Sequence, residues 1–420
     1  MLERTYRQRL EADLARWEAD GVITPAVLAA IRAALPPLAP GINIAVVVAI
    51  VGGLLIAAAF LAFVAAHWTE ITRLVRLVML FAGILTAYGL GGWFARSDQP
   101  VLADLCAAVG ALIFGAAIAL VGQMYHLGGD FAGGMLLWGI GALAAAALTG
   151  SRGALAVALS AATIWSLMRI VESGDLHFAF AIFWLAAAGH AMAWNSRVAA
   201  HLVAVAALPW WITSAFQGHL DFRPSFVLAN GAALLFGGGL ALAALRSPRA
   251  NQAGSVLSTY GAFSLAGAAI LEAMFANDVF RISREFANQP LWIIGCGAAG
   301  AILAIAAVAT TRRAGTAFAA IAIALVLAAV AIWTPRQSGD PWLAYAALLC
   351  AMLCLVVSGM LDDARPRIVA GWLGIAGVIA AITWAVKGSL LKRSIFLATA
   401  GIVAVVLASG LNRFVPGRRK

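Results

Sequence analysis

The chain has 420 residues, of which 63% are hydrophobic and only 11% are charged, whereas a soluble domain usually carries about 25% charged residues. A soluble core of this length cannot hide so much apolar surface, so the composition excludes a soluble globular protein. The net charge of +10 does not predict nucleic-acid binding, because basic residues in a membrane protein first report which loops stay in the cytoplasm.

The first forty residues are far more polar than the rest of the chain. The segment RTYRQRLEADLARWEADG places apolar side chains on one helical face at a period near 3.6 residues. After Gly21, the segment ITPAVLAAIRAALPP restarts a helix with Thr24 as N-cap and Pro25 at the first helical position. We predict a cytoplasmic amphipathic helical hairpin over residues 1–40. Its apolar stripe comprises Leu10, Leu14, Trp17, Val27, Leu28 and Ile31.

Three environments suit that stripe, and the sequence leaves all three open. The two helices can close on each other, they can lie on the membrane surface, or they can dock on a protein partner. A short amphipathic pair usually buries its stripe on the nearest apolar surface, which favours the first two.

Apolar runs of about 20 residues, the length that crosses the hydrocarbon core of a bilayer, recur from residue 43 onward. The predicted fold class is therefore all-α, a polytopic transmembrane bundle of about 14 spans. The spans are expected near residues 43–66, 74–95, 101–123, 132–149, 154–171, 177–195, 198–216, 225–245, 255–275, 291–310, 315–333, 341–360, 368–386 and 394–411.

The loops predict the orientation. With the N-terminus inside, 18 of the 28 Lys and Arg residues fall in inner segments and 10 in outer loops, as the preference of basic residues for the cytoplasmic side requires. Both termini are therefore expected in the cytoplasm and the lipid bilayer is the main partner. The basic tail 413–420 suits contact with an anionic leaflet. The protein is expected in a bacterial plasma membrane as a multi-pass protein.

The N-terminal third resembles a known family. The segments RWEADGVITPAVLAAI, AAHWTEI and GALIFGAAIALVGQMYHLGGDF together are similar to a bacterial family of predicted membrane proteins, domain of unknown function 2157. The resemblance extends over about residues 1–150. It implies a membrane location and an N-terminal cytoplasmic segment, and it brings no activity, substrate or cofactor. We therefore divide the chain into the hairpin, a family-like four-span unit at 41–150, further spans at 151–412 and the tail.

Polar residues collect at one point of that family-like segment. In VGQMYHLGGDF, Gln123 and His126 are three residues apart and share a helix face. The run containing Tyr125 and Asp130 follows an apolar span, which places all four residues at its predicted outer end.

An internal comparison adds two further residues to this predicted patch. The segment VGGLLIAAAFLAFVAAHW aligns with VGALIFGAAIALVGQMYH at an offset of 58 residues. His67 and Glu70 then occupy the corresponding outer end of the first span. Alignment by composition alone is the other explanation, because any two spans rich in Ala and Gly match in this way.

The six residues His67, Glu70, Gln123, Tyr125, His126 and Asp130 therefore form the candidate polar site. If its two imidazoles and two carboxylates converge, they suit a divalent metal or a general acid and base pair. The alternative is that they are ordinary interfacial residues and helix caps.

The remaining signals predict little chemistry. No phosphate-cradling glycine loop, nucleophile elbow or HExxH pair is present, so no catalytic residue or cofactor is assigned. We expect no ionisable side chain near mid-membrane, since Glu272 and Arg169 fall near outer span ends. Glycine groups such as Gly237 to Gly239 are expected first to let helices pack closely. With Asn230 upstream, Gly237 to Gly239 are also the best candidates for a broken helix that lines a cavity.

The leading hypothesis is a transport-type or lipid-handling bundle with an outward-facing polar patch. A membrane-embedded metal-dependent enzyme is the alternative, and a scaffold or regulator that acts through the N-terminal hairpin is the third possibility.

Overall fold

The computed structural model describes residues 2–34, 72–126, 130–174, 176–217, 224–275, 291–332 and 342–385, with isolated positions between 48 and 62. All regular structure within these ranges is α-helical, which confirms the predicted all-α fold class. The chain divides into two units, residues 1–59 and residues 60–420.

The first unit contains the hairpin helices α1 (Leu2–Ala19) and α2 (Pro25–Ala34). Gly21 adopts a φ of 69°, a left-handed conformation that glycine reaches without a steric penalty. Thr24 Oγ1 then accepts a hydrogen bond from the backbone N–H of Val27 at 3.4 Å, as an N-cap residue does. The two helices contact one another, and an ion pair of 3.0 Å joins Arg32 of α2 to Glu11 of α1.

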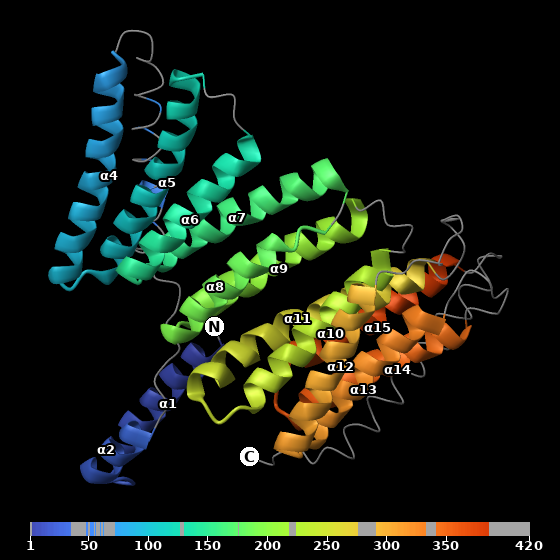
Figure 1. Ribbon diagram of the computed structural model, residues 1–420. Helices are drawn as coiled ribbons and strands as arrows, with labels where there is room; N and C mark the ends of the chain where they lie inside the picture. The colour runs from blue at the N-terminus through green and yellow to red at the C-terminus, as the bar shows by residue number, and fades with distance from the viewer. Residues whose placement is uncertain are drawn as a thin grey trace. The chain divides into compact units, whose positions relative to one another are not determined.

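The second unit contains twelve described helices, each antiparallel to the next along the chain (Figure 1). They are α4 (Arg73–Arg96), α5 (Pro100–Met124), α6 (Phe131–Thr149), α7 (Arg152–Ser173), α8 (Ala179–Ala193), α9 (Arg197–Gln217), α10 (Pro224–Ala244), α11 (Pro248–Phe275), α12 (Leu291–Thr311), α13 (Ala314–Ile332), α14 (Trp342–Leu361) and α15 (Arg365–Ala385). Apart from the start of α11, their ends lie within about three residues of the predicted spans.

Eleven of these described helices are long and apolar enough to cross a membrane, and α8 is a shorter apolar helix of 15 residues. The multi-pass helical architecture is therefore confirmed. The predicted spans 43–66 and 394–411 lie outside the described residues, apart from the isolated positions in the first of them, so the count of 14 stays a prediction.

The core of the second unit forms two large clusters of buried side chains. One joins helices α5 through α9, and the other joins the end of α9 to helices α10 through α15. A smaller cluster centred on Ala200, Ala204 and Val256 connects α9 with α11. Alanine dominates all three, which lets helices approach closely where dispersion forces are the main attraction between them.

Tryptophan side chains hydrogen-bond across neighbouring helices. The Nε1 group of Trp138 on α6 donates to the carbonyl of Ala111 on α5 at 2.9 Å. Trp211 on α9 donates in the same way to Val227 on α10 at 2.8 Å. These bonds give the indole N–H groups a partner that they would otherwise lack in an apolar medium.

The glycines of α10 have the packing role expected of them, and the alternative of a broken helix is wrong. Helix α10 is continuous through Gly237 and Gly239, and these glycines allow close contact with neighbouring helices. A Cβ atom on Gly237 would lie 1.9 Å from the carbonyl oxygen of Gly300 on α12, and one on Gly239 would lie 2.3 Å from the backbone nitrogen of Ser258 on α11. The backbones of α10, α11 and α12 therefore touch directly.

Candidate functional site

The predicted polar patch begins where α5 ends. Gln123, Tyr125 and His126 are exposed at that end, and His126 has a φ of 47° in the turn that follows. Asp130 is the N-cap of α6, and its Oδ1 accepts a hydrogen bond from the backbone N–H of Ala132 at 3.0 Å. His67 and Glu70 lie outside the described residues, so their convergence with this group stays a prediction.

Asp130 has a second partner that the sequence analysis did not assign. Its carboxylate forms an ion pair with Arg169 at the end of α7, and Arg169 also pairs with Glu172 at 3.0 Å. In the described part of the chain, no three or more His, Cys, Asp or Glu side chains are placed to bind a metal ion together. The contacts of Asp130 are those of a helix cap and an ion pair that joins α6 to α7.

His177 lies beside this ion-pair network, in the loop between α7 and α8. Its Nδ1 is 3.2 Å from Ser166 Oγ, and its ring packs edge-on against Trp165 at 4.4 Å between ring centroids. Burial lowers the pKa of His177 below its usual value, and the positive charge of Arg169 lowers it further. The neutral imidazole is therefore favoured in the folded protein.

Glu272 lies near a span end, as expected, but its side chain is enclosed by protein. It lies in the last turn of α11, yet it is fully buried, and Ser225 of α10 donates a hydrogen bond of 2.5 Å to its Oε2. Buried carboxylates need such donors because their desolvation is costly. Its position in the chain indicated an outer end, whereas tertiary packing from α10 encloses it.

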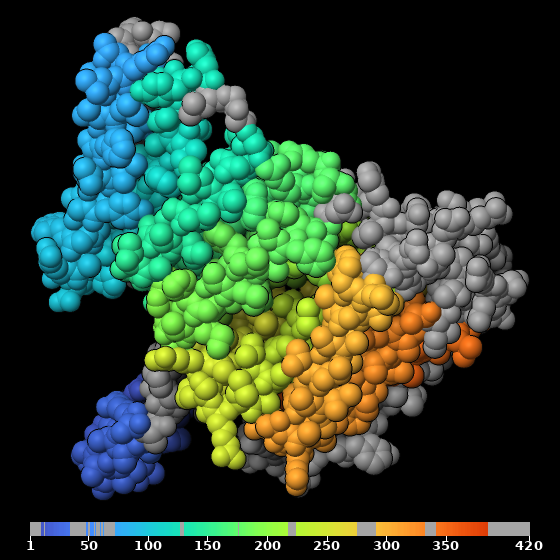
Figure 2. Space-filling view, viewed as in Figure 1, coloured from blue at the N-terminus to red at the C-terminus, as the bar shows by residue number. Residues whose placement is uncertain are grey.

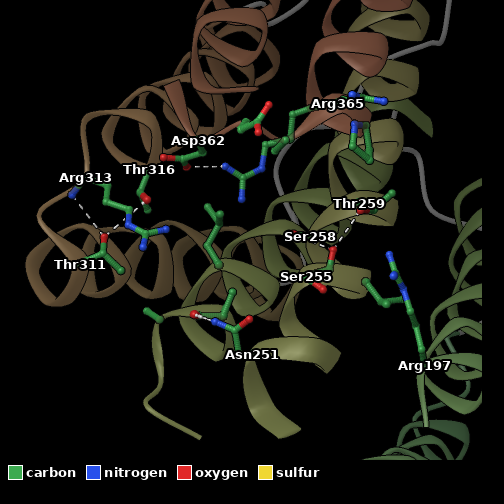
Figure 3. Close-up of a pocket in the computed structure, with 18 of the residues that line it drawn as sticks. Arg197, Asn251, Ser255, Ser258, Thr259, Thr311, Arg313, Thr316, Asp362 and Arg365 are labelled. Atoms are coloured by element: carbon green, nitrogen blue, oxygen red, sulfur yellow. Dashed lines mark hydrogen bonds and ion pairs between the residues drawn. The ribbon is translucent and has the colours of Figure 1, made fainter. Parts of the chain in front are cut away.

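A cavity of about 530 Å³ opens at the other end of the same bundle. Its walls come from the first turns of α9, α13 and α15, the N-terminal part of α11, the last turns of α10 and α12, and the turns that join α12 to α13 and α14 to α15 (Figure 3). The polar lining residues are Arg197, His201, Asn251, Ser255, Ser258, Thr259, Thr311, Arg313, Thr316, Asp362, Asp363, Arg365 and Arg367.

A buried ion pair forms part of the cavity wall. Arg367 Nη1 lies 2.8 Å from Asp362 Oδ2, and each side chain is only 11% exposed. The same Nη1 group donates to Ser358 Oγ at 3.3 Å, and the guanidinium lies 5.8 Å from the ring centroid of Phe236. Because each charge has an opposite partner, this pair contributes no net charge to the cavity.

Helix α11 carries a polar stripe into the cavity. Asn251, Ser255 and Thr259 are four residues apart, so they lie on one face, and all three line the cavity. Eight residues of helix extend roughly 12 Å at 1.5 Å per residue. Ser255 and Thr259 bond within their own helix, since Ser255 Oγ donates to the carbonyl of Gln252 and Thr259 Oγ1 to that of Ser255, at 2.8 and 2.9 Å.

The cavity was not predicted from the sequence. The polar stripe was visible as an i, i+4, i+8 pattern, and it could have marked the start of α11 as a non-lipid surface. The convergence of α9, α13 and α15 on that stripe was not visible, because their arginines resemble the ordinary basic residues of inner loops. By the predicted orientation, the cavity faces the cytoplasm.

The comparisons with known proteins concern a different part of the chain. Residues 15–155 match the family described as Predicted membrane protein (DUF2157), which confirms the resemblance found in the sequence. Searches of curated proteins and of solved structures gave no significant match. The matched segment ends at the start of α7, whereas the cavity is built from α9 to α15.

Proposed function

We propose that this multi-pass membrane protein is a transport-type or lipid-handling bundle, and that it handles a lipid or lipid-like molecule in the cavity at the start of α9, α11, α13 and α15. The size and lining of the cavity carry the proposal. Its volume of about 530 Å³ is within the range of roughly 300–1,000 Å³ that small-molecule sites occupy. Its lining combines charged groups with apolar residues such as Leu240 and Val256, as an amphipathic ligand requires.

The position of the cavity favours lipid handling over transport of a charged solute through the bundle. Thr259 at the cavity and Glu272 at the far end of α11 are 13 residues apart, roughly 20 Å along the helix. Between them, Leu265 and Ala269 are fully buried in the helix core. The cavity therefore ends well before the buried carboxylate, and it suits a ligand that enters from one side of the membrane.

The orientation and location in this proposal come from the sequence. The charge of the loops supports cytoplasmic termini in a bacterial plasma membrane, which puts the cavity at the level of the inner leaflet.

The experiment compares two serine variants in reconstituted vesicles. Ser255→Trp fills the cavity from α11, whereas Ser160→Trp places the same bulk on an exposed position of α7 away from the cavity. Movement of fluorescent phosphatidylglycerol and phosphatidylethanolamine between leaflets is followed by quenching with an impermeant reductant. The proposal expects faster movement with wild type than in protein-free vesicles, lost in Ser255→Trp and kept in Ser160→Trp. Equal rates with and without wild-type protein would reject lipid handling.

One observation favours a second role, as a scaffold or regulator that acts through the hairpin. Leu14 and Leu28 are buried, yet Trp17 and Val27 stay 41% and 46% exposed. Part of the apolar stripe is therefore open to another surface. If that surface is the membrane or the protein's own bundle, Trp17→Glu lowers accumulation of the protein. Normal accumulation with loss of a co-purifying protein would favour the scaffold.

A further inference from the structure

We propose that the cavity binds a phosphate group, and that Arg197, Arg313 and Arg365 are the residues that bind it. This inference rests on the proposed function, in that it takes the cavity to be the ligand site. It goes further by naming the chemical group that the site recognises. The three arginines come from the start of α9, the turn before α13 and the start of α15.

The first observation behind the proposal is the balance of charge among the residues that line the cavity. Arg367 is paired with Asp362 inside the wall, so these two residues cancel. The three remaining arginines are exposed, and within the described ranges none of them forms an ion pair. Only one further lining carboxylate, that of Asp363, opposes them. The described lining therefore has an excess of positive charge.

The second observation is that arginines line the cavity from more than one side. In Figure 3, Arg197 and Arg313 lie on opposite sides of the cavity, with Ser255 and Ser258 between them. A carboxylate offers two oxygens in one plane, whereas a phosphate group presents several oxygens in a tetrahedral arrangement. A phosphate can therefore accept bonds from donors on more than one side, and guanidinium groups bind it through two parallel N–H bonds.

The hydroxyl groups and helix ends add donors of the same kind. A serine or threonine hydroxyl can rotate away from its own helix and donate to a ligand oxygen. In addition, α9, α11, α13 and α15 all begin at this end of the bundle. Unpaired N–H groups and the positive ends of helix dipoles lie at such starts, and both favour an anion.

Retention of basic residues on the cytoplasmic side explains arginines at this end without any ligand. Under that explanation, arginines inside and outside the cavity should contribute equally to phosphate binding. A matched arginine outside the cavity therefore distinguishes it from the proposal. Arg249 is an exposed arginine in the first turn of α11 at the same end of the bundle, but it does not line the cavity.

The test measures ligand-dependent thermal stability of the full-length protein in a neutral detergent. The variants are Arg313→Gln, the triple variant Arg197→Gln with Arg313→Gln and Arg365→Gln, and the control Arg249→Gln. The probes are short-chain phosphatidylglycerol, inorganic phosphate and glycerol 3-phosphate, each compared with chloride at equal ionic strength. Since the substituted arginines are exposed, unliganded stability should stay close to wild type, which size-exclusion chromatography verifies.

We expect a saturable rise in the unfolding temperature of wild type with at least one phosphate probe. Loss of one charge-assisted arginine contact weakens binding by about tenfold or more, so Arg313→Gln should bind at least that much more weakly and the triple variant should lose saturation. Arg249→Gln should bind like wild type. A response to phosphatidylglycerol alone identifies the lipid headgroup as the source, and a response to the soluble probes identifies a free phosphate compound.

Two results overturn the inference: no saturable response to any phosphate probe, or equal weakening by Arg249→Gln and Arg313→Gln. The lipid-movement assay reports separately on the proposed function. Lipid movement blocked by Ser255→Trp but unaffected in the triple arginine variant would leave lipid handling intact and reject phosphate recognition. Phosphate binding without lipid movement would support phosphate recognition and reject lipid handling.

Discussion

Helices α4 to α6 bury little of their surface, whereas most helices from α10 to α15 bury about half of theirs. In the most apolar window of each helix, the buried share is 11% for α4 and 22% for α6, but 56% for α10 and 50% for α11 and α14. Figure 2 shows one flank of α4 free of contact with the other described helices, and its principal described contact is with α5.

The difference lies in how closely the helices approach, and not in how apolar they are. The mean hydropathy of the best window is 1.8 for α4 and also 1.8 for α10. Leu74, Phe81 and Leu85 of α4 are more than 60% exposed, which suits contact with lipid. The glycines of α10 instead meet neighbouring backbones. Hydropathy identifies a span, but small residues decide whether it packs against protein or faces lipid.

The same comparison separates the family match from the proposed ligand site. The matched segment 15–155 contains the loosely packed α4 to α6. The cavity lies in the tightly packed part, where rigid helix contacts fix the position of polar side chains. A site that must place arginines from three helices needs such contacts.

The largest expected effect comes from adding one carbon to Gly237. Gly237→Ala would place Cβ against the backbone of Gly300, whereas Gly238→Ala has open space, because the nearest neighbouring atom, Cδ1 of Leu303, is 4.0 Å away. Overpacking of this kind costs about 1–3 kcal/mol. Thermal unfolding in detergent should show a clear loss for Gly237→Ala and, because alanine favours a helix over glycine, wild-type or slightly higher stability for Gly238→Ala. Equal stability of the two variants would mean that α10 and α12 are not in backbone contact.

The second prediction compares the loss of a buried glutamate with the loss of an exposed one. Glu272→Ala removes the buried acceptor of Ser225, and leaving such a hydroxyl unpaired costs about 1–3 kcal/mol. Glu172→Ala removes an exposed carboxylate from Arg169, and exposed ion pairs contribute about 0–1 kcal/mol. Chemical denaturation of both variants measures the difference. A more destabilised Glu172→Ala would contradict the burial of Glu272.

Substitutions in the predicted polar patch should change the free energy of unfolding only slightly if the patch serves as a helix cap and an interfacial surface. Asp130→Asn keeps the acceptor for the Ala132 N–H group but removes the charge from the Arg169 pair, so we expect a loss of about 1 kcal/mol or less. His126→Gln, at an exposed turn position, should be neutral. A zinc titration of wild type and of the double variant tests the metal hypothesis. Binding in wild type that disappears in the folded double variant would establish a metal site.

The smallest effect is a dependence on pH through His177. Its folded-state pKa lies below the usual 6.5 because burial and Arg169 disfavour the charged ring. As the pH falls through about 6.5, the unfolded chain takes up a proton before the folded one does, so stability falls. The unfolding temperature should drop between pH 7.5 and 5.5 by more in wild type than in His177→Asn. An identical drop in both would show that other groups cause it.

The sequence was enough to predict the helices and not enough to predict the site. Continuous apolar runs gave twelve helix positions within a few residues, because the thickness of a bilayer fixes the length of a span. The ion pair of Asp130 with Arg169 and the enclosure of Glu272 depend on which helices are neighbours, which hydropathy does not encode. For Gly237 to Gly239 the sequence left both packing and a helix break open, because a glycine that permits unwinding and one that permits close packing look the same in a sequence.

The central claim is that the tightly packed half of the protein holds a ligand cavity open to the cytoplasm, and labelling of Ser255→Cys tests it most directly. The variant is made after replacing Cys106, Cys296, Cys350 and Cys354, and it is treated with a membrane-impermeant maleimide in vesicles of each orientation. We predict labelling from the cytoplasmic side only, slowed when short-chain phosphatidylglycerol fills the cavity. Labelling from the outer side only, or none from either side while the denatured protein labels fully, would contradict the account.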